Sequence, residues 1–237
     1  ALPLFVWMGE ILFRTKLSEN LFKGLAPWMS RLPGGLIHVN VVGCALFAAI
    51  SGSSAATVAT VGKMSIPELR KRNYPEKLLL GSLAGSGTLG LLIPPSIILI
   101  IYGVTVQESI AKLFIAGIIP GIMLAIFFML YVIGWSVLNK NSMPKMDETF
   151  SFSQKIKQSG QLIPVIVLIL SVIGSIYVGI ATATEAASLG VVGALILSFF
   201  QKSLNKETFK LSLLGATKTS CMIAFILAGS AFLSLAM

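Results

Sequence analysis

The sequence predicts an all-α polytopic membrane protein, because three of its features fit lipid better than water. Of its 237 residues, 55% are hydrophobic and only 11% are charged, whereas about 25% of residues are charged in an ordinary soluble domain. Apolar segments recur along the whole chain, which a single cleaved signal peptide does not explain. The basic residues collect between these segments, as membrane topology requires.

Long apolar runs with almost no charge follow one another along the chain. A run of about 20 such residues can cross the roughly 30 Å hydrocarbon core of a bilayer as a helix. The run 186–200 is short, so we expect its helix to include residues of the preceding ATATE segment. Ala1 and Met237 both lie inside apolar segments, so we expect the chain to be a fragment. The runs are 77–102, 113–138, 161–178, 186–200 and 211–237.

Charge and cysteine content argue against two kinds of partner. A net charge of +9 would suggest nucleic acid in a soluble domain, but here the basic residues flank apolar runs, so we expect no nucleic-acid binding. Cys44 and Cys221 lie in apolar segments without a CxxC pattern or a His partner. We therefore expect both cysteines to have packing roles, and we expect neither a disulfide framework nor a metal site.

The basic residues also predict the topology. Apart from Lys112, they fall in four stretches that the positive-inside rule places in the cytoplasm. If residues 35–62 crossed the membrane once, the first two stretches would lie on opposite sides. An even number of passes or a re-entrant hairpin keeps both stretches on the same side of the membrane. This parity of crossings favours a hairpin at 35–62. The stretches are 14–31, 63–77, 140–157 and 202–218, with 103–112 and 179–185 on the opposite face.

Residues 35–62 have the composition of such a hairpin. An apolar arm leads to the tip, residues 51–54 (SGSS), and a second arm of small residues follows. Lipid satisfies no backbone N–H or C=O group, so irregular backbone at membrane depth survives only inside protein or beside a wet cavity. The Gly/Ser tip therefore predicts a cavity within the membrane.

The next apolar run predicts a discontinuous helix. It is interrupted at residues 87–90 and again at Pro94-Pro95. Proline has no N–H to donate and disfavours the helical region for the residue before it, so we expect a break near Leu92 and Ile93. Secondary transporters build their ion and substrate sites from such hairpins and broken helices.

Two segments are too polar to span the bilayer. Residues 10–32 mix charges with Leu, Phe and Trp, which predicts an arm in the cytoplasmic interface. Residues 139–160 form the one long polar loop and the expected boundary between two halves. Trp28 and Trp135 are expected to be interfacial anchors.

Three strings of the sequence carry a family resemblance. GSSAATVATVG (52–62), GTLGLLIPPSI (87–97) and GIATATEAASLGVVGAL (179–195), in this order, resemble the large membrane subunit of TRAP (tripartite ATP-independent periplasmic) transporters. The resemblance covers essentially the whole chain. It implies an elevator-type transporter with two inverted repeats, each containing a re-entrant hairpin and a discontinuous helix.

On this resemblance the chain holds the first repeat and the start of the second. The second hairpin, a second Na⁺ site and part of the substrate site are expected beyond residue 237. The expected parts are the end of a transmembrane helix with an interfacial arm (1–34), the hairpin (35–62), the broken helix and a transmembrane helix of the first repeat (63–138), a cytoplasmic loop (139–160) and the incomplete second repeat (161–237).

The resemblance also implies a function. TRAP large subunits belong to Na⁺-coupled secondary active transporters that import small organic anions, here of the sialic acid or C4-dicarboxylate class. The implied partners are a periplasmic substrate-binding protein and a small membrane subunit, separate or fused. The implied location is the bacterial inner membrane. No enzyme activity and no organic cofactor are expected, and Na⁺ is the coupling ion.

The site residues follow from the same resemblance. Na⁺ ligands are implied at the tip and in the broken helix, and several of them would act through backbone carbonyls, which suit a hard cation. Substrate contacts are expected from Ser53, Thr57 and Thr88. The implied Na⁺ ligands are Ser51, Ser54, Gly90, Ile93 and Pro95.

Each of these readings has a plainer alternative. The tip serines, with Thr57 and Thr60, would also suit close helix packing, and the glycines and prolines of 87–95 would also suit a simple kink. Glu185 is a carboxylate among apolar runs, hence a possible functional group. It would equally suit the outer surface or a helix start capped by Thr182 or Thr184.

Other classes of function compete with transport. The chain could be a non-transporting membrane scaffold or anchor in a larger complex. A channel is disfavoured because the sequence offers no ring of charges. An intramembrane serine protease using the single histidine, His38, is weakly supported because the tip has no evident base partner.

Overall fold

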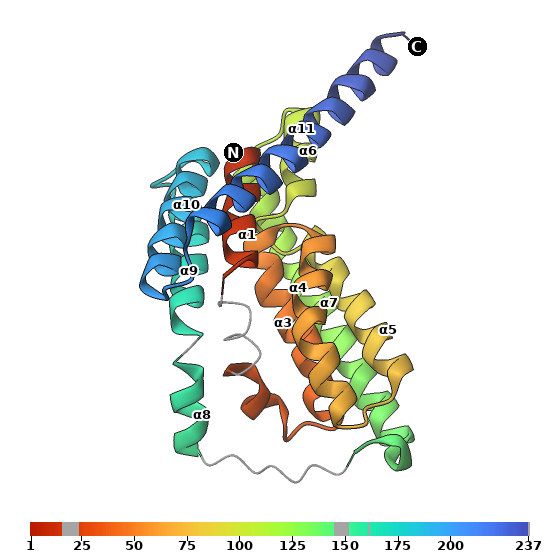
Figure 1. The fold of residues 1–237 in the computed structure, drawn as a ribbon. Helices are drawn as coiled ribbons and strands as arrows, with labels where there is room; N and C mark the ends of the chain where they lie inside the picture. The colour runs from red at the N-terminus through yellow and green to blue at the C-terminus, as the bar shows by residue number, and fades with distance from the viewer. Residues whose placement is uncertain (16–23, 145–151, 161, 237) are drawn as a thin grey trace.

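The computed structural model describes residues 1–15, 24–144, 152–160 and 162–236, and every regular element in these ranges is a helix (Figure 1). The elements are α1 (Leu2–Phe13), η1 (Gly35–Ile37), α3 (His38–Ser51), α4 (Ser54–Lys71), α5 (Glu76–Gly87), η2 (Thr88–Leu91), α6 (Ile97–Val106), α7 (Ile110–Leu138), η3 (Lys140–Ser142), α8 (Phe152–Ser159), α9 (Ile163–Tyr177), α10 (Ala183–Phe200) and α11 (Lys206–Ala236).

Three helices of the described ranges, α7, α10 and α11, are long and apolar enough to cross a membrane. Their outward faces carry large apolar side chains, such as Ile119, which is 77% exposed, and Phe225, which is 82% exposed. Burying such side chains in lipid removes them from water as effectively as a protein core would. The all-α membrane class predicted from composition is therefore confirmed.

The helices pack as two groups that meet along α1 (Figure 1). In the first group α3, α4 and α5 contact one another, and α7 packs against α3, α5 and α6. In the second group α1 packs on α10 and α11, and α9 packs on α10. One main core joins the groups, with Met8 and Ile11 of α1, Phe47 of α3, Leu79 of α5 and Val165 of α9 all buried in it.

Residues 35–62 form the greater part of a helical hairpin, whose two arms are α3 and α4. The second arm does not end near Gly62 but continues to Lys71. The end of the hairpin was expected at Gly62 because the charged residues begin at Lys63, but charge alone does not end a helix. Basic residues in the last turn, Arg70 and Lys71, suit the negative end of the helix dipole.

Other boundaries also differ from the sequence expectation. α1 runs through Phe13, so the first residues of the expected interfacial arm, 10–32, belong to an apolar helix. Residues 24–29 are helical, and 16–23 lie outside the described ranges. As expected, α10 draws its first turn from the ATATE segment and begins at Ala183. Within the polar segment 139–160, α8 contacts the arm where Trp28 Nε1 donates to Ser159 Oγ at 2.6 Å.

Candidate functional site

The tip of the hairpin, residues 51–54, turns the chain within two residues. α3 ends because Gly52 adopts a left-handed conformation (φ 58°), and its N–H donates to Ala48 O at 3.0 Å. Ser53 is extended, and its Oγ accepts from the N–H of Ala56, which makes Ser53 the N-cap of α4. The SGSS string thus supplies both the glycine that ends one arm and the serine that starts the next.

The side chains of the tip bond mainly to one another. Ser51 Oγ lies 2.9 Å from Thr57 Oγ1 and accepts from the N–H of Ser53 at 3.3 Å. Thr57 is fully buried inside the hairpin. In the structure its hydroxyl joins the start of α4 to Ser51 at the end of α3. Contact of Thr57 with substrate stays a prediction.

The discontinuous helix is interrupted by the break, residues 88–96, which comprises η2 and the non-helical residues 92–96. The break spans the expected Leu92 and Ile93 and includes a cis Pro94-Pro95 peptide. Its own hydrogen bonds are few: the N–H groups of Leu92 and Ile93 both donate to Leu89 O, and Ser96 Oγ donates to Leu91 O at 2.8 Å. Helix resumes at Ile97.

The tip lies directly on the break. The N–H of Ile97 donates to Gly52 O at 3.1 Å. A Cβ atom added at Gly52 would lie 2.5 Å from Pro95 O, and one added at Gly90 would lie 2.9 Å from Ser54 N. Such approaches are closer than real Cβ contacts, so glycine is required on both sides. The structure therefore brings tip and break together through their backbones.

Several residues of the tip and the break carry oxygen atoms without hydrogen-bond donors. Among the described residues, no donor is found for the carbonyl oxygens of Ser51, Gly90, Ile93 or Pro95. The hydroxyl of Ser54 is buried and also lacks a partner. Ser51 ends α3 and residues 92–96 lie outside any helix, so carbonyls here lack an intrahelical partner and are available to a ligand. Neutral oxygens are the ligands that a hard cation accepts, and this donor set fits Na⁺.

Ser53 of the tip and Thr88 of the break are predicted substrate contacts. Ser53 is half-buried and caps α4. Thr88 starts the break, is exposed, and its Oγ1 donates to Gly85 O at 2.7 Å. Both are at the surface of the junction, and their contact with substrate stays a prediction.

Glu185 forms a capping box at the start of α10. Its carboxylate accepts from the backbone N–H and the hydroxyl of Thr182, at 2.7 and 2.8 Å, and its own N–H donates to Thr182 Oγ1. Thr182, rather than Thr184, is the N-cap. The side chain is exposed, and α10 packs on α1 and α9 rather than on the hairpin. This geometry satisfies the capping alternative, and a role of Glu185 in transport stays a prediction.

His38 starts α3, whereas the tip serines lie at its end. Ser51 is thirteen positions after His38 in the same helix, which corresponds to a rise of about 20 Å. The imidazole is buried, and its Nε2 lies 2.7 Å from Pro33 O. It cannot serve a tip serine as a base.

Sequence reasoning missed three glycines that contact the site from other helices. A Cβ atom at Gly9 of α1 would lie 2.9 Å from Ser51 Cα, and one at Gly117 of α7 would lie 2.6 Å from Leu92 O. Gly121, one turn further on α7, faces Ile93. The only sequence signal was their place in otherwise apolar helices, GIIPG in the case of α7.

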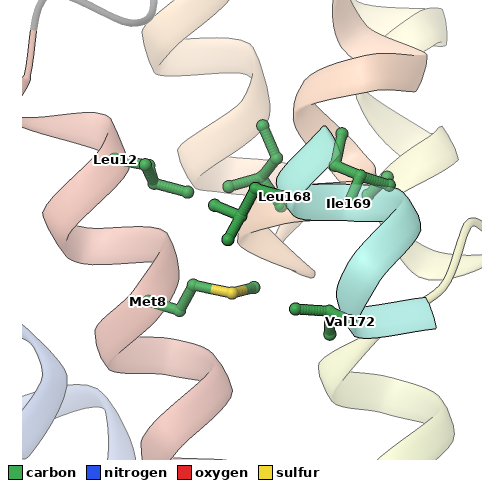
Figure 2. A pocket seen from close by; sticks show the side chains of 7 residues that line it. Met8, Leu12, Leu168, Ile169 and Val172 are labelled. Carbon is green, nitrogen blue, oxygen red and sulfur yellow. The ribbon is translucent and has the colours of Figure 1, made fainter. Parts of the chain in front are cut away.

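Beside the tip, the two helix groups leave a small apolar pocket. Figure 2 shows Met8 and Leu12 of α1 near Leu168 and Val172 of α9 across this pocket. Ala49 and Ile50, from the last turns of α3, complete the lining. The lining of this pocket carries no charged side chain.

Together, the fold and the site define a polytopic membrane protein of the kind in which a helical hairpin meets a discontinuous helix. The chain belongs to the DctM component family of tripartite ATP-independent periplasmic transporters, whose family model matches residues 1–237. It is an inner-membrane protein, and its relatives are transporter permeases rather than enzymes.

Several curated relatives are similar over nearly the whole chain. The C4-dicarboxylate TRAP transporter large permease protein DctM of Pseudomonas aeruginosa is 32% identical over 97% of this chain and 53% of its own length. The isethionate TRAP transporter permease protein DctMQ of Oleidesulfovibrio alaskensis is 34% identical over 96% of the chain and 36% of its own length. The 2,3-diketo-L-gulonate permease YiaN of Escherichia coli is 32% identical over 97% and 54%. The chain spans about half the length of most of these relatives.

Proposed function

We propose that the protein containing this chain is the large membrane subunit of a Na⁺-coupled secondary transporter that imports a small organic anion. The relatives are named for C4-dicarboxylates, isethionate and diketogulonate, which are all small organic anions, and for ectoine. We place the substrate in the C4-dicarboxylate or sialic acid class. A periplasmic binding protein delivers it, and a small membrane subunit, separate or fused, completes the membrane complex.

The observation that carries the Na⁺ assignment is the cluster of oxygens without donors at the junction of tip and break. The carbonyls of Ser51, Gly90, Ile93 and Pro95, with Ser54, would hold the ion. Bound Na⁺ would satisfy acceptors that are costly to leave unpaired within a membrane protein. It would also join the tip to the break, so that ion binding orders both.

The same junction offers a place for an anionic group. α4 begins at the tip and α6 begins where the break ends, so two helix N-termini lie together. The positive end of each helix dipole favours an anion. Ser53 and Thr88, at the surface of the junction, are the side chains that we expect to donate hydrogen bonds to the substrate.

The two helix groups suit an elevator movement. The tip and the break both belong to the group of α3 to α7, so this group would carry a complete half-site as one body. The other group meets it along α1 through apolar side chains and Gly9, without an ion pair across the contact in the described residues. Such a surface imposes no desolvation of charge when it slides.

Uptake by the intact complex tests this function. The complete membrane complex is reconstituted in liposomes, a panel of labelled organic anions with matching binding proteins is added outside, and uptake is compared with and without an inward Na⁺ gradient. We expect accumulation only with Na⁺. Uptake at the same rate in K⁺ or choline would contradict the coupling.

A thermal measurement separates the transporter from a scaffold. Any ligand that binds only the folded state raises the melting temperature with its concentration. We expect Na⁺, and neither K⁺ nor choline at equal ionic strength, to raise the melting temperature of the purified complex. A non-transporting scaffold predicts equal melting temperatures in the three salts.

A further inference from the structure

The long helix α7 contacts the break through glycine. A Cβ atom added at Gly117 would lie 2.6 Å from Leu92 O, and one added at Gly121 would lie 3.0 Å from Ile93 Cγ1 and 3.6 Å from Ile93 N. Both glycines are buried, and they lie on one face of the helix with Phe114. The backbone of α7 therefore lies against the backbone of the break at the two residues that precede Pro94-Pro95.

The position of the break depends on packing contacts such as this one because few hydrogen bonds hold it. The N–H groups of Leu92 and Ile93 both donate to one acceptor, Leu89 O. No donor in the described ranges bonds to the carbonyl oxygens of residues 92–95. A segment without a regular ladder takes its conformation from packing against its neighbours, and here the neighbour on one side is the tip and on the other is α7.

The two glycines differ in how firmly they constrain the break. At Gly117 the opposing atom is a backbone oxygen, which can move only with the Leu92–Ile93 peptide. At Gly121 the nearest atom belongs to the Ile93 side chain, which can change rotamer, and the backbone atoms stand at ordinary contact distance. Gly134, on the same helix, has nothing within 4 Å of an added Cβ atom.

We infer that Gly117 and Gly121 are positioning residues for the cation site: they hold the Leu92–Ile93 backbone where the carbonyls of Ile93 and Pro95 can face the tip. This inference rests on the proposed Na⁺ site. The glycines touch no ligand themselves. They act by letting α7 approach the break closely enough to fix it. A methyl group at Gly117 would displace the Leu92–Ile93 backbone, and one at Gly121 would displace it less because the Ile93 side chain can yield.

The test substitutes alanine at three positions of α7 in the intact complex: Gly117→Ala, Gly121→Ala and, as the matched control, Gly134→Ala. The readout is the Na⁺ concentration that gives half of the maximal rise in melting temperature, with choline keeping ionic strength constant. We expect Gly117→Ala to raise this concentration by about tenfold, as for the loss of one good ligand oxygen. Gly121→Ala should raise it less, and Gly134→Ala should leave it unchanged.

The melting temperature without Na⁺ separates positioning from simple packing. If the glycines only pack, the alanine variants melt lower without Na⁺ but keep the wild-type half-maximal concentration, and the inference is overturned. If Gly117→Ala does not fold, Gly121→Ala decides, because its softer contact leaves room for a native fold. A wild-type complex without any Na⁺ response would instead overturn the proposed function.

Discussion

Gly9 of α1 lies against the backbone of Ser51 at the hairpin tip. An added Cβ atom would stand 2.9 Å from Ser51 Cα and 3.3 Å from its carbonyl oxygen, one of the oxygens without a donor. α1 packs mainly on α10 and α11, so Gly9 is one of the points at which the second helix group reaches the candidate site. Close backbone approach of this kind is how small residues bring membrane helices together.

Gly9→Ala is therefore expected to act on transport as well as on stability. Because the added methyl meets backbone rather than a mobile side chain, we expect overpacking of about 1–3 kcal/mol, with slower Na⁺-driven uptake. Proteoliposome uptake and melting temperature measure the two effects. Gly174→Ala on α9, where an added Cβ meets nothing within 4 Å, is the control. Wild-type uptake by Gly9→Ala would show that the α1 contact does not constrain the tip.

Because most of the proposed Na⁺ ligands are backbone carbonyls, we expect Gly90→Ala to impair Na⁺ binding more than Ser54→Ala does. Gly90→Ala places a methyl group 2.9 Å from Ser54 N and should abolish Na⁺-dependent stabilisation. Ser54→Ala removes a buried hydroxyl that has no partner, so the free energy of unfolding without Na⁺ should stay within about 1 kcal/mol of wild type. Na⁺ titration of both proteins checks this. If Ser54→Ala lost more Na⁺ affinity than Gly90→Ala, the hydroxyl rather than the backbone would be the main ligand.

Asn40 should contribute to stability and not to ion binding. It is fully buried, and its Nδ2 donates to Leu79 O at 3.2 Å and to Ser82 Oγ at 3.0 Å, which joins α3 to α5. We expect Asn40→Ala to cost about 1–3 kcal/mol through lost and unpaired hydrogen bonds, with the half-maximal Na⁺ concentration unchanged. Ser65→Ala, which removes a buried hydroxyl without a partner, is the control and should be neutral. A shift in Na⁺ dependence would link this end of α3 to the tip.

The two roles considered for Glu185 predict different outcomes. As a member of a capping box it should matter only for the start of α10, so Glu185→Gln should retain near wild-type uptake. Thr182→Ala removes the N-cap and should cost about 0.5–2 kcal/mol of stability. Uptake and melting temperature of both variants are compared. A more than tenfold loss of uptake by Glu185→Gln in a protein of normal stability would establish a functional carboxylate instead.

The backbone interruptions of the candidate site could be predicted because their signals are local. Gly52 between serines indicates a helix stop followed by a helix start, and Pro94-Pro95 cannot continue a helix in any tertiary context. The outer end of α4 was misplaced because its composition changes at Lys63 while its conformation does not. Local chemistry identifies interruptions well and the ends of continuous helices less well.

The residues that sequence reasoning missed depend on distant neighbours. Nothing near Gly9 in the sequence indicates that Ser51 will lie against it, and nothing near Gly117 points to Leu92. A glycine in an apolar helix is consistent with packing against lipid, another helix or irregular backbone. Only the tertiary arrangement distinguishes these cases, and the identity of the ion remains a prediction from chemistry and family.

The hydrogen bond from Ile97 N–H to Gly52 O is made entirely by main-chain atoms, as are most of the contacts around it. The chemical groups at the junction are thus present in every amino acid, and what is particular to this chain is where glycine and proline permit them to face inward. In the described residues no group of three or more His, Cys, Asp or Glu side chains could hold a metal ion. Surveys that look for ion sites by acidic, thiol or imidazole side chains would pass over the site proposed here, whereas a search for paired interruptions of apolar helices would find this junction.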